Sequence, residues 1–354
     1  MSKVVLKGVS KRYGDVVALR ELDLEIREGE FLTLLGPSGC GKTTTLRMIA
    51  GFIEPSTGTI LLGDEDVTHV RPNKRGIGMV FQDYALFPHM TIGENIAFGL
   101  VERKVDKTAV ARRVRELLEL VRLPQMENRF PPELSGGQQQ RIAVARAVAY
   151  SPKVLLMDEP LGALDLKLRE VMQGEIRQIQ KKLGITTVYV THDQTEAMHM
   201  SDRIAVMNHG VMEQIGTAED IYKRPRTRFV ADFIGQINLL DATVVDAQRG
   251  HTDLDIDGRR VRAQGCEGPA SGKVTLAIRP QHLALVARGG AANGNRFDGK
   301  VAGTTFSGNL VHVEVLLDGG QKTTVEARPE DAPAAPGDSV AVEWKPETGI
   351  VLTK

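Results

Sequence analysis

A glycine-rich segment that ends in lysine and threonine carries the chemistry of phosphate binding. It fits the pattern G-x-x-x-x-G-K-[ST] and consists of Gly36, Pro37, Ser38, Gly39, Cys40, Gly41, Lys42 and Thr43, with Thr44 next to it. A strand-like run (31–35) precedes it and a helical run (44–50) follows, which is the context that the pattern requires. Glycines let backbone N–H groups point at phosphate oxygens, and the helix start adds its positive dipole end. We therefore expect Lys42 to reach the β- and γ-phosphates of a nucleotide, and the Thr43 hydroxyl to bind Mg²⁺.

Two adjacent carboxylates, Asp158 and Glu159, follow a second apolar run (154–157). A hard anionic ligand beside a phosphate loop suits Mg²⁺, and a second carboxylate can polarise an attacking water. We expect Asp158 to take the first role and Glu159 the second. Taken alone, the pair is equally typical of a solvated strand end. The two motifs together predict a nucleoside triphosphatase without saying which kind.

A second helix start also has the features of an anion site. Serine followed by glycines precedes a helical run (139–150), and such a start presents free N–H groups and a positive dipole end. The chain thus offers two helix starts for phosphate but only one loop lysine. One explanation is a composite site, in which this start faces a nucleotide held by another copy of the chain. Its residues are Ser135, Gly136, Gly137 and Gln138.

With these motifs in this order, the sequence resembles the ABC (ATP-binding cassette) ATPases over residues 1 to about 235. The matching positions are the signature (134–138), the Walker B pair (Asp158 and Glu159), the Q-loop glutamine (Gln82), the D-loop (161–165), the switch histidine (His192) and the aromatic residue that stacks on adenine (Tyr13). The resemblance implies a P-loop α/β fold with a helical subdomain at about 91–150. It also implies the cofactors ATP and Mg²⁺.

The same resemblance implies an assembly and a role for each site residue. A homodimer closes head-to-tail around two ATP molecules, each held between the Lys42 loop of one copy and the Ser135 helix of the other. Asp165 joins that helix in contacting ATP in trans. The catalytic residues would be Glu159, His192 and Gln82. The metal contacts would come from Thr43, Gln82 and Asp158.

Outside this family context, single residues are weaker evidence of function. Tyr13, Gln82 and His192 would otherwise be ordinary surface, packing or loop residues. Arg141, just after the signature, is expected to be structural. Cys40 stands where the family often has serine, and we expect an alkylatable thiol that nucleotide protects.

Composition limits the function classes. Hydrophobic residues make up 42% and charged residues 25% of 354, and the formal net charge is zero. This predicts a soluble globular protein without the basic surplus of a nucleic-acid binder. Cys40 and Cys266 have no ligand-like spacing, so a disulfide framework is not expected. No signal peptide is evident and no apolar run reaches the roughly 18–20 residues of a membrane span. If the protein works at a membrane, another chain would have to bind it there.

The hydrophobic pattern of the sequence changes after about Gly235. Apolar runs and helical patterns alternate before this point, whereas short alternating strand-like runs such as 310–315 follow it. We therefore expect an ATPase domain at 1–235 and an all-β, OB-like domain at 236–354. A strand, a basic-Pro-polar turn and a second strand recur near 277–286 and 343–352, which indicates two related β units.

This C-terminal region is similar to the regulatory (TOBE) extension of one subgroup of importer ATPases. The join (229–238) resembles the polyamine and iron branches more than the sugar branch, and residues 304–308 and 344–347 resemble the polyamine (spermidine/putrescine) type. The implied protein lies on the cytoplasmic face of the inner membrane as a peripheral subunit. Its partners would be two integral membrane permease subunits and a solute-binding protein, with no nucleic acid. The β region can equally be a dimer-stabilising module without a ligand site.

Alternative functions remain open at this stage. The same importer role for ferric iron, phosphonate or sugar is one, since a separate binding protein and the membrane subunits choose the cargo. A non-transport ABC ATPase of repair or translation fits less well, because neither coiled-coil inserts nor a second cassette is present. An exporter is disfavoured by the β extension, and a P-loop kinase or GTPase by the signature.

Overall fold

A computed structural model describes residues 2–162, 164–248, 250–264, 272–289, 294–331 and 335–353, so Cys266 and Ala163 lie outside the described residues. Contacts divide the chain into two compact units, Met1–Ile221 and Tyr222–Lys354. None of the helices in the described ranges combines the length and apolar character that crossing a membrane requires.

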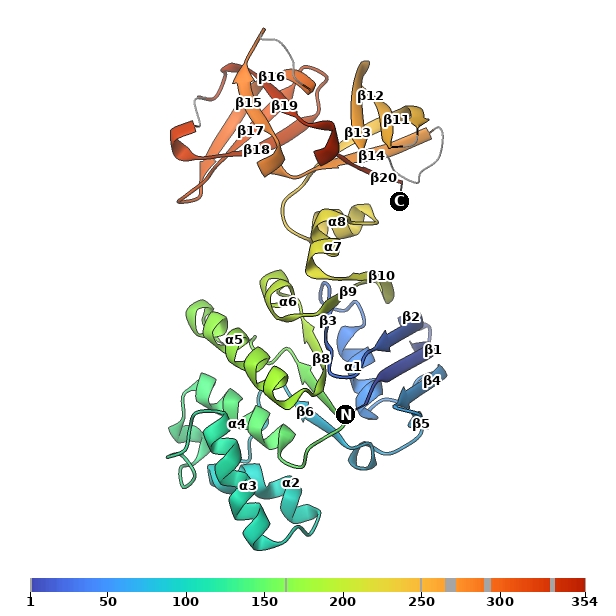
Figure 1. Cartoon of the computed structure of the whole chain (residues 1–354). Helices are drawn as coiled ribbons and strands as arrows, with labels where there is room; N and C mark the ends of the chain where they lie inside the picture. The colour runs from blue at the N-terminus through green and yellow to red at the C-terminus, as the bar shows by residue number, and fades with distance from the viewer. Residues whose placement is uncertain are drawn as a thin grey trace. The chain divides into compact units, whose positions relative to one another are not determined.

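A six-stranded sheet forms the centre of the first unit (Figure 1). Its order is β10 (Val211–Gly216), β9 (Arg203–Asn208), β3 (Phe31–Leu35), β8 (Thr186–Thr191), β7 (Val154–Asp158) and β6 (Ile77–Val80). All neighbours are parallel except the β9–β10 hairpin. Every residue of β3, β7 and β8 is buried, as expected for strands covered on both faces. The carboxyl ends of these three strands therefore meet at one edge.

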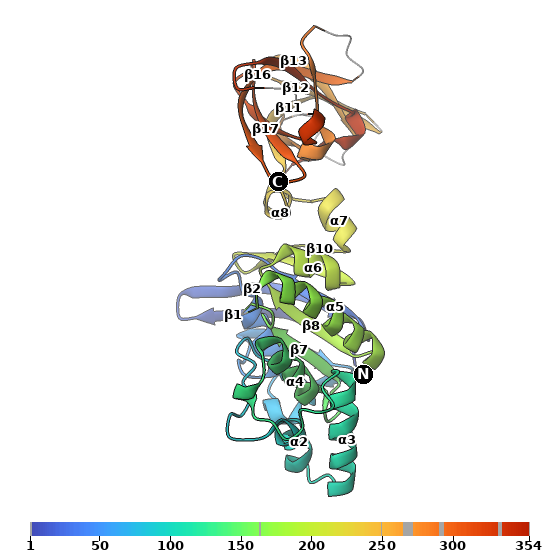
Figure 2. The same cartoon turned by 90° about the vertical axis from the view of Figure 1, so that its left-hand side faces the viewer.

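Different elements cover the two faces of this sheet. One face packs on α1 (Lys42–Ala50) and on an antiparallel sheet of order β2 (Val16–Ile26), β1 (Val4–Tyr13), β4 (Thr57–Leu62) and β5 (Glu65–Asp66). The other face packs on α5 (Leu166–Leu183) and on α2 (Ile92–Glu102), α3 (Lys107–Leu120) and α4 (Gly136–Val148). Figures 1 and 2 show α2, α3 and α4 gathered together. A short helix, α6 (Gln194–Met200), follows β8.

The second unit consists mainly of two five-stranded antiparallel sheets. The first has the order β13 (Arg259–Gln264), β12 (His251–Ile256), β11 (Asn238–Gln248), β14 (Gly272–Ile278) and β20 (Ile350–Leu352). The second has the order β15 (Ala284–Ala287), β19 (Ser339–Trp344), β16 (Asn295–Phe306), β17 (Val311–Leu317) and β18 (Lys322–Ala327). One core joins both sheets, and the rings of Phe297 and Trp344 stack within it at 5.6 Å. The expected all-β character of this region is confirmed.

The division between the units falls earlier than the expected one after Gly235. It lies within α7 (Ala218–Lys223), and α8 (Arg228–Phe233) belongs to the second unit. Arg279 explains this, because its buried guanidinium donates to the carbonyls of Tyr222 at 3.1 Å, Gln236 at 3.0 Å and Ile234. The Arg-Pro turn noted in the sequence thus fastens the preceding helical segment to the β unit.

Candidate functional site

The phosphate loop connects β3 to α1 along a path that requires glycine. A β-carbon on Gly36 would stand 2.2 Å from the Met207 carbonyl oxygen, which no side chain allows. Gly39 and Gly41 have φ angles of 77° and 104°, in the region that L-residues avoid. In the described part of the chain no side chain caps α1 at Gly41, so its first N–H groups are left for an anion.

Lys42 lies inside this loop with only 4% of its surface exposed. Its ammonium group donates to the carbonyl oxygens of Gly36 at 2.7 Å and Pro37 at 2.9 Å. Both acceptors are neutral. The loop therefore holds a positive charge at its centre that an anionic ligand would balance.

Thr43 and Asp158 bring two oxygen donors together. The Thr43 hydroxyl donates to Asp158 Oδ1 at 3.0 Å, and Asp158 is 7% exposed. Burial raises the pKa of the Asp158 carboxyl, although the bond from Thr43 and the nearby Arg47 oppose this. Arg47 Nη2 lies 3.8 Å from Asp158 Oδ2. A hydroxyl and a carboxylate side by side are hard oxygen ligands that fit Mg²⁺, with phosphate and water completing its shell.

Glu159 and His192 form the next pair, at the ends of neighbouring strands β7 and β8. Their side chains meet with His192 Nδ1 3.2 Å from Glu159 Oε2. Glu159 has a φ of 44°, which is uncommon for a residue with a β-carbon, and its N–H donates to the Val190 carbonyl at 3.0 Å. The strained backbone turns the carboxylate out of the sheet edge toward the histidine. A base oriented by a second group at this position can act on a water molecule.

Arg169 links the D-loop to the segment of the switch histidine. It donates to the Leu164 carbonyl at 3.1 Å and pairs with Asp193 at 3.0 Å. Asp165 caps α5 by accepting from the Leu168 N–H at 3.0 Å. The sequence interpretation missed Arg169 and also Arg47. No local pattern could have revealed them, since Arg47 pairs with Asp158 and Arg169 with Asp193, on other elements.

The remaining predicted residues occupy separate places. A β-carbon on Gly162 would meet Gln82 Nε2 at 3.8 Å, so the Gln82 side chain lies beside the loop that follows Glu159. Tyr13, at the end of β1, is 48% exposed with Lys11 Nζ 5.0 Å from its ring centre. Ser135 caps α4 and exchanges hydrogen bonds with Gln138 in a capping box.

The helices α1 and α4 pack on opposite faces of the parallel sheet. Helix α1 shares a core with Leu32 and Leu34 of β3, whereas the core of α4 includes Phe31 of the same strand. Successive residues of a strand point to opposite faces. The helices that begin at Lys42 and at Ser135 therefore pack on different faces of the sheet, and a β-carbon on Gly136, at the start of α4, would meet the Leu164 side chain at 3.3 Å.

Cys40 differs from the expectation of an alkylatable thiol. It is 3% exposed, and burial raises the pKa of its thiol above the usual 9.0 despite the nearby Lys42 ammonium. The thiolate is the reactive form, so a raised pKa leaves less of it at neutral pH than in an exposed cysteine.

We therefore expect slow alkylation of Cys40 by iodoacetamide in the nucleotide-free protein at pH 7–8, with a rate that rises as the pH passes 9. The measurement is mass-spectrometric labelling in a Cys266→Ser background. Ser38→Cys combined with Cys40→Ser is the matched control, since Ser38 is exposed in the same loop. Equal rates for the two thiols at pH 7.5 would contradict the expectation.

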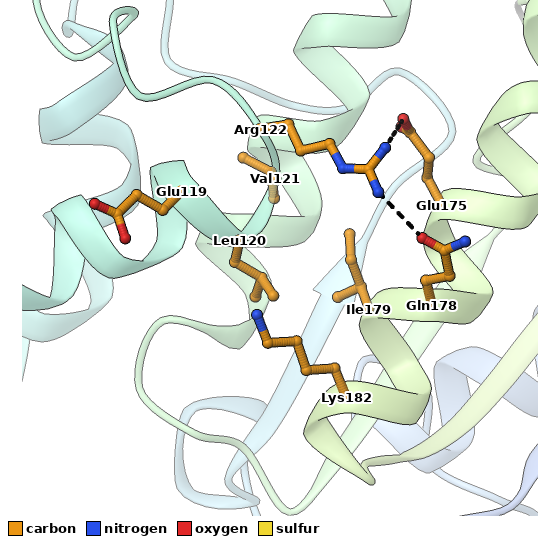
Figure 3. A pocket seen from close by; sticks show the side chains of 8 residues that line it. All are labelled: Glu119, Leu120, Val121, Arg122, Glu175, Gln178, Ile179 and Lys182. Atoms are coloured by element: carbon orange, nitrogen blue, oxygen red, sulfur yellow. Dashed lines mark hydrogen bonds and ion pairs between the residues drawn. The ribbon is translucent and has the colours of Figure 1, made fainter.

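A cleft of about 190 Å³ lies apart from these residues, where the end of α3 meets α5 (Figure 3). Arg122 lies 3.9 Å from Glu175 and donates to Gln178 at 3.4 Å. Glu175 is also 2.7 Å from Arg141 Nε on α4. These paired charges join α4, α5 and the turn after α3, and this agrees with the structural role expected for Arg141.

Comparisons with known proteins decide the family. Residues 19–162 match the family model described as ABC transporter, and residues 276–352 match the TOBE domain. A spermidine/putrescine import ATP-binding protein of Thermobifida fusca is 48% identical over 357 residues, covering 99% of this chain and 93% of the relative. The protein of that name from Oleidesulfovibrio alaskensis is 46% identical over 359 residues, covering 98% and 96%. The chain belongs to the ABC transporter ATP-binding proteins.

Solved structures agree with this assignment. The ABC ATPase resembles cbiO1 of Clostridium perfringens, part of the cbiONQ ABC transporter complex, with a TM-score of 0.58 and 29% identity over 62% of this chain and 89% of that one. It also resembles a dimeric bacterial ABC transporter cassette, with a TM-score of 0.54 and 33% identity over 61% and 98%. The expected family, fold class and ATP-hydrolysing activity are confirmed.

Proposed function

We propose that this ABC ATPase powers the import of polyamines of the spermidine/putrescine type. One observation carries the proposal: relatives bearing that name are 46–48% identical over nearly the whole chain, the β unit included. These matches extend beyond the ATPase domain and include the C-terminal region.

In the proposed ATP site, each residue has a chemical task. The N–H groups of the loop and the Lys42 ammonium bind the phosphates, while the exposed ring of Tyr13 stacks on adenine. Thr43 and Asp158 would hold Mg²⁺, with Gln82 completing the contacts, and the ion supplies positive charge against the phosphates when bound. Glu159 takes the proton of the attacking water, and His192 orients the Glu159 carboxylate and steadies the γ-phosphate.

A second copy of the chain completes this site. Because α1 and α4 pack on opposite faces of the sheet, the Ser135 start serves a nucleotide held by another copy in this proposal. The proposed homodimer is head-to-tail about a two-fold axis, so each interface residue acts twice. The trans contacts come from Ser135, Gly136, Gly137, Gln138 and Asp165.

The membrane partners are proposed to meet the surface around Gln82. Phe52 is 54% exposed and its ring lies 6.2 Å from that of Phe81, which directly precedes Gln82. Nearby, Phe98 is 37% exposed and packs on Phe87 at 4.7 Å. Exposed aromatic clusters are typical of protein interfaces. Two permease subunits docked here would hold the ATPase on the cytoplasmic face of the inner membrane, with a solute-binding protein on the other side.

The test is ligand-stimulated ATP hydrolysis by the complete transporter. The chain is co-expressed with its genomic neighbours, reconstituted in vesicles, and assayed with the binding protein and spermidine, putrescine, ferric iron, phosphonate or sugar. Stimulation by the polyamines, abolished by Glu159→Gln, is expected. Stimulation by another ligand alone would show that the protein powers an importer with a different cargo. Failure to assemble with any membrane protein would overturn the importer itself.

A further inference from the structure

The segment after Gln82 has an unusual backbone. Tyr84 and Ala85 have φ angles of 61° and 47°, so two successive residues with β-carbons lie in the left-handed region. L-residues adopt this region rarely because the β-carbon crowds the carbonyl group. Interactions elsewhere in the fold must therefore hold the segment in place.

Arg146, on α4, makes those interactions. Its Nη1 donates to the Ala85 carbonyl at 2.7 Å and its Nη2 to the Tyr84 carbonyl at 3.0 Å. The planar fork of arginine fits two successive carbonyls in a way that a lysine ammonium cannot. Burial lowers the pKa of the guanidinium, and its centre lies 5.4 Å from the ring of Phe87. The buried Arg146 guanidinium therefore uses two of its N–H groups to hold the backbone of this loop.

A second contact fastens the other end of the segment to the same helices. Asn95 of α2 is fully buried, accepts from the Phe87 N–H at 2.8 Å and donates to the Phe87 carbonyl at 3.1 Å. Gln82, by contrast, lies beside Gly162 at the carboxyl edge of the sheet. The loop therefore runs from the ATP site to the helical part of the unit within a few residues.

We propose that Arg146 is a positioning residue that couples the Gln82 loop to α4, the helix that begins at Ser135. By holding Tyr84 and Ala85 in the left-handed conformation, it makes the segment move with α4. A displacement of α4 on a nucleotide is then transmitted to Gln82 through a short length of chain. The inference rests on the proposed composite ATP site, in which the start of α4 binds ATP of the other copy.

The test uses Arg146→Lys with and without Ala85→Gly, each as the full chain in the assembled transporter. Lysine keeps the charge but loses the fork, so kcat for ATP should fall ~10- to 100-fold through misplacement of Gln82. KM for ATP should stay close to that of the wild type, because the Lys42 loop is untouched. Glycine adopts the left-handed region without steric cost, so Ala85→Gly should restore most of the kcat of Arg146→Lys.

Arg141→Lys is the matched control, since Arg141 lies on the same helix but pairs with Glu175 of α5. Any loss that it causes should not be restored by Ala85→Gly. Ala85→Val provides a second route that leaves α4 intact, because a β-branched residue opposes the left-handed conformation. It should lower kcat at constant KM, even if Arg146→Lys fails to fold.

Three results would overturn the inference: wild-type kcat in Arg146→Lys or Ala85→Val, equal rescue of the Arg141 variant by Ala85→Gly, or no rescue of a folded Arg146→Lys. The proposed ATP site has a separate test, since it fails if Ser135→Arg retains full hydrolysis. The two failures are therefore distinguishable.

Discussion

Replacing Glu159 with glutamine is expected to lower ATP turnover by ~10²- to 10⁴-fold, the usual contribution of a general base. The amide keeps the size of the carboxylate and its hydrogen bond to His192, which lies 3.2 Å away, but it cannot accept a proton from water. ATP binding should persist, because the Lys42 loop and the Thr43–Asp158 pair are unchanged. A bound but uncleaved nucleotide should also trap the closed homodimer.

Steady-state hydrolysis, equilibrium ATP binding and gel filtration with ATP and Mg²⁺ measure the three effects. Glu170→Gln is a suitable control, since Glu170 is exposed on α5, outside the predicted site. Full turnover by the Glu159 variant would remove this residue from the mechanism. A loss of ATP binding equal to the loss of turnover would assign Glu159 to binding instead.

The local parts of the site could be predicted from the sequence because they depend on neighbouring residues. The phosphate loop requires glycine at particular positions, and the structure places Gly39 and Gly41 in the left-handed region. The apolar runs before Asp158 and His192 predict parallel strands that end at one edge. The pairs Thr43–Asp158 and Glu159–His192 form at that edge, where β8 lies between β3 and β7.

Contacts between distant residues could not be predicted in this way. Arg146 and Ala85 are 61 positions apart, and Arg279 binds a carbonyl 57 positions earlier. Arginine on a helix or in a turn is typical of a solvent-exposed position, so nothing local marks Arg146 or Arg279 as a buried anchor. The buried state of Cys40 could not be predicted for the same reason, since burial is decided by elements far along the chain.

The second prediction with a large expected effect on ATP hydrolysis follows from the composite site. Ser135→Arg should preserve ATP binding to the single chain and abolish hydrolysis, because the bulky cation blocks a helix start that acts only on the other copy's nucleotide. Lys42→Ala should weaken ATP binding itself, since it removes the positive charge at the centre of the loop. Both purified homodimers should therefore be inactive, and equilibrium binding with fluorescent ATP should distinguish the two defects.

Mixing the two inactive variants tests whether the site is shared. A mixed dimer places both substitutions in one site and leaves the other intact, so random pairing should restore about one quarter of wild-type activity if the sites act independently. Such activity cannot come from either homodimer. Ser307→Arg serves as the control, because Ser307 is an exposed serine of the β unit. If Ser135→Arg instead loses ATP binding as a single chain, its helix start acts in cis, and the site is not shared between two copies as proposed.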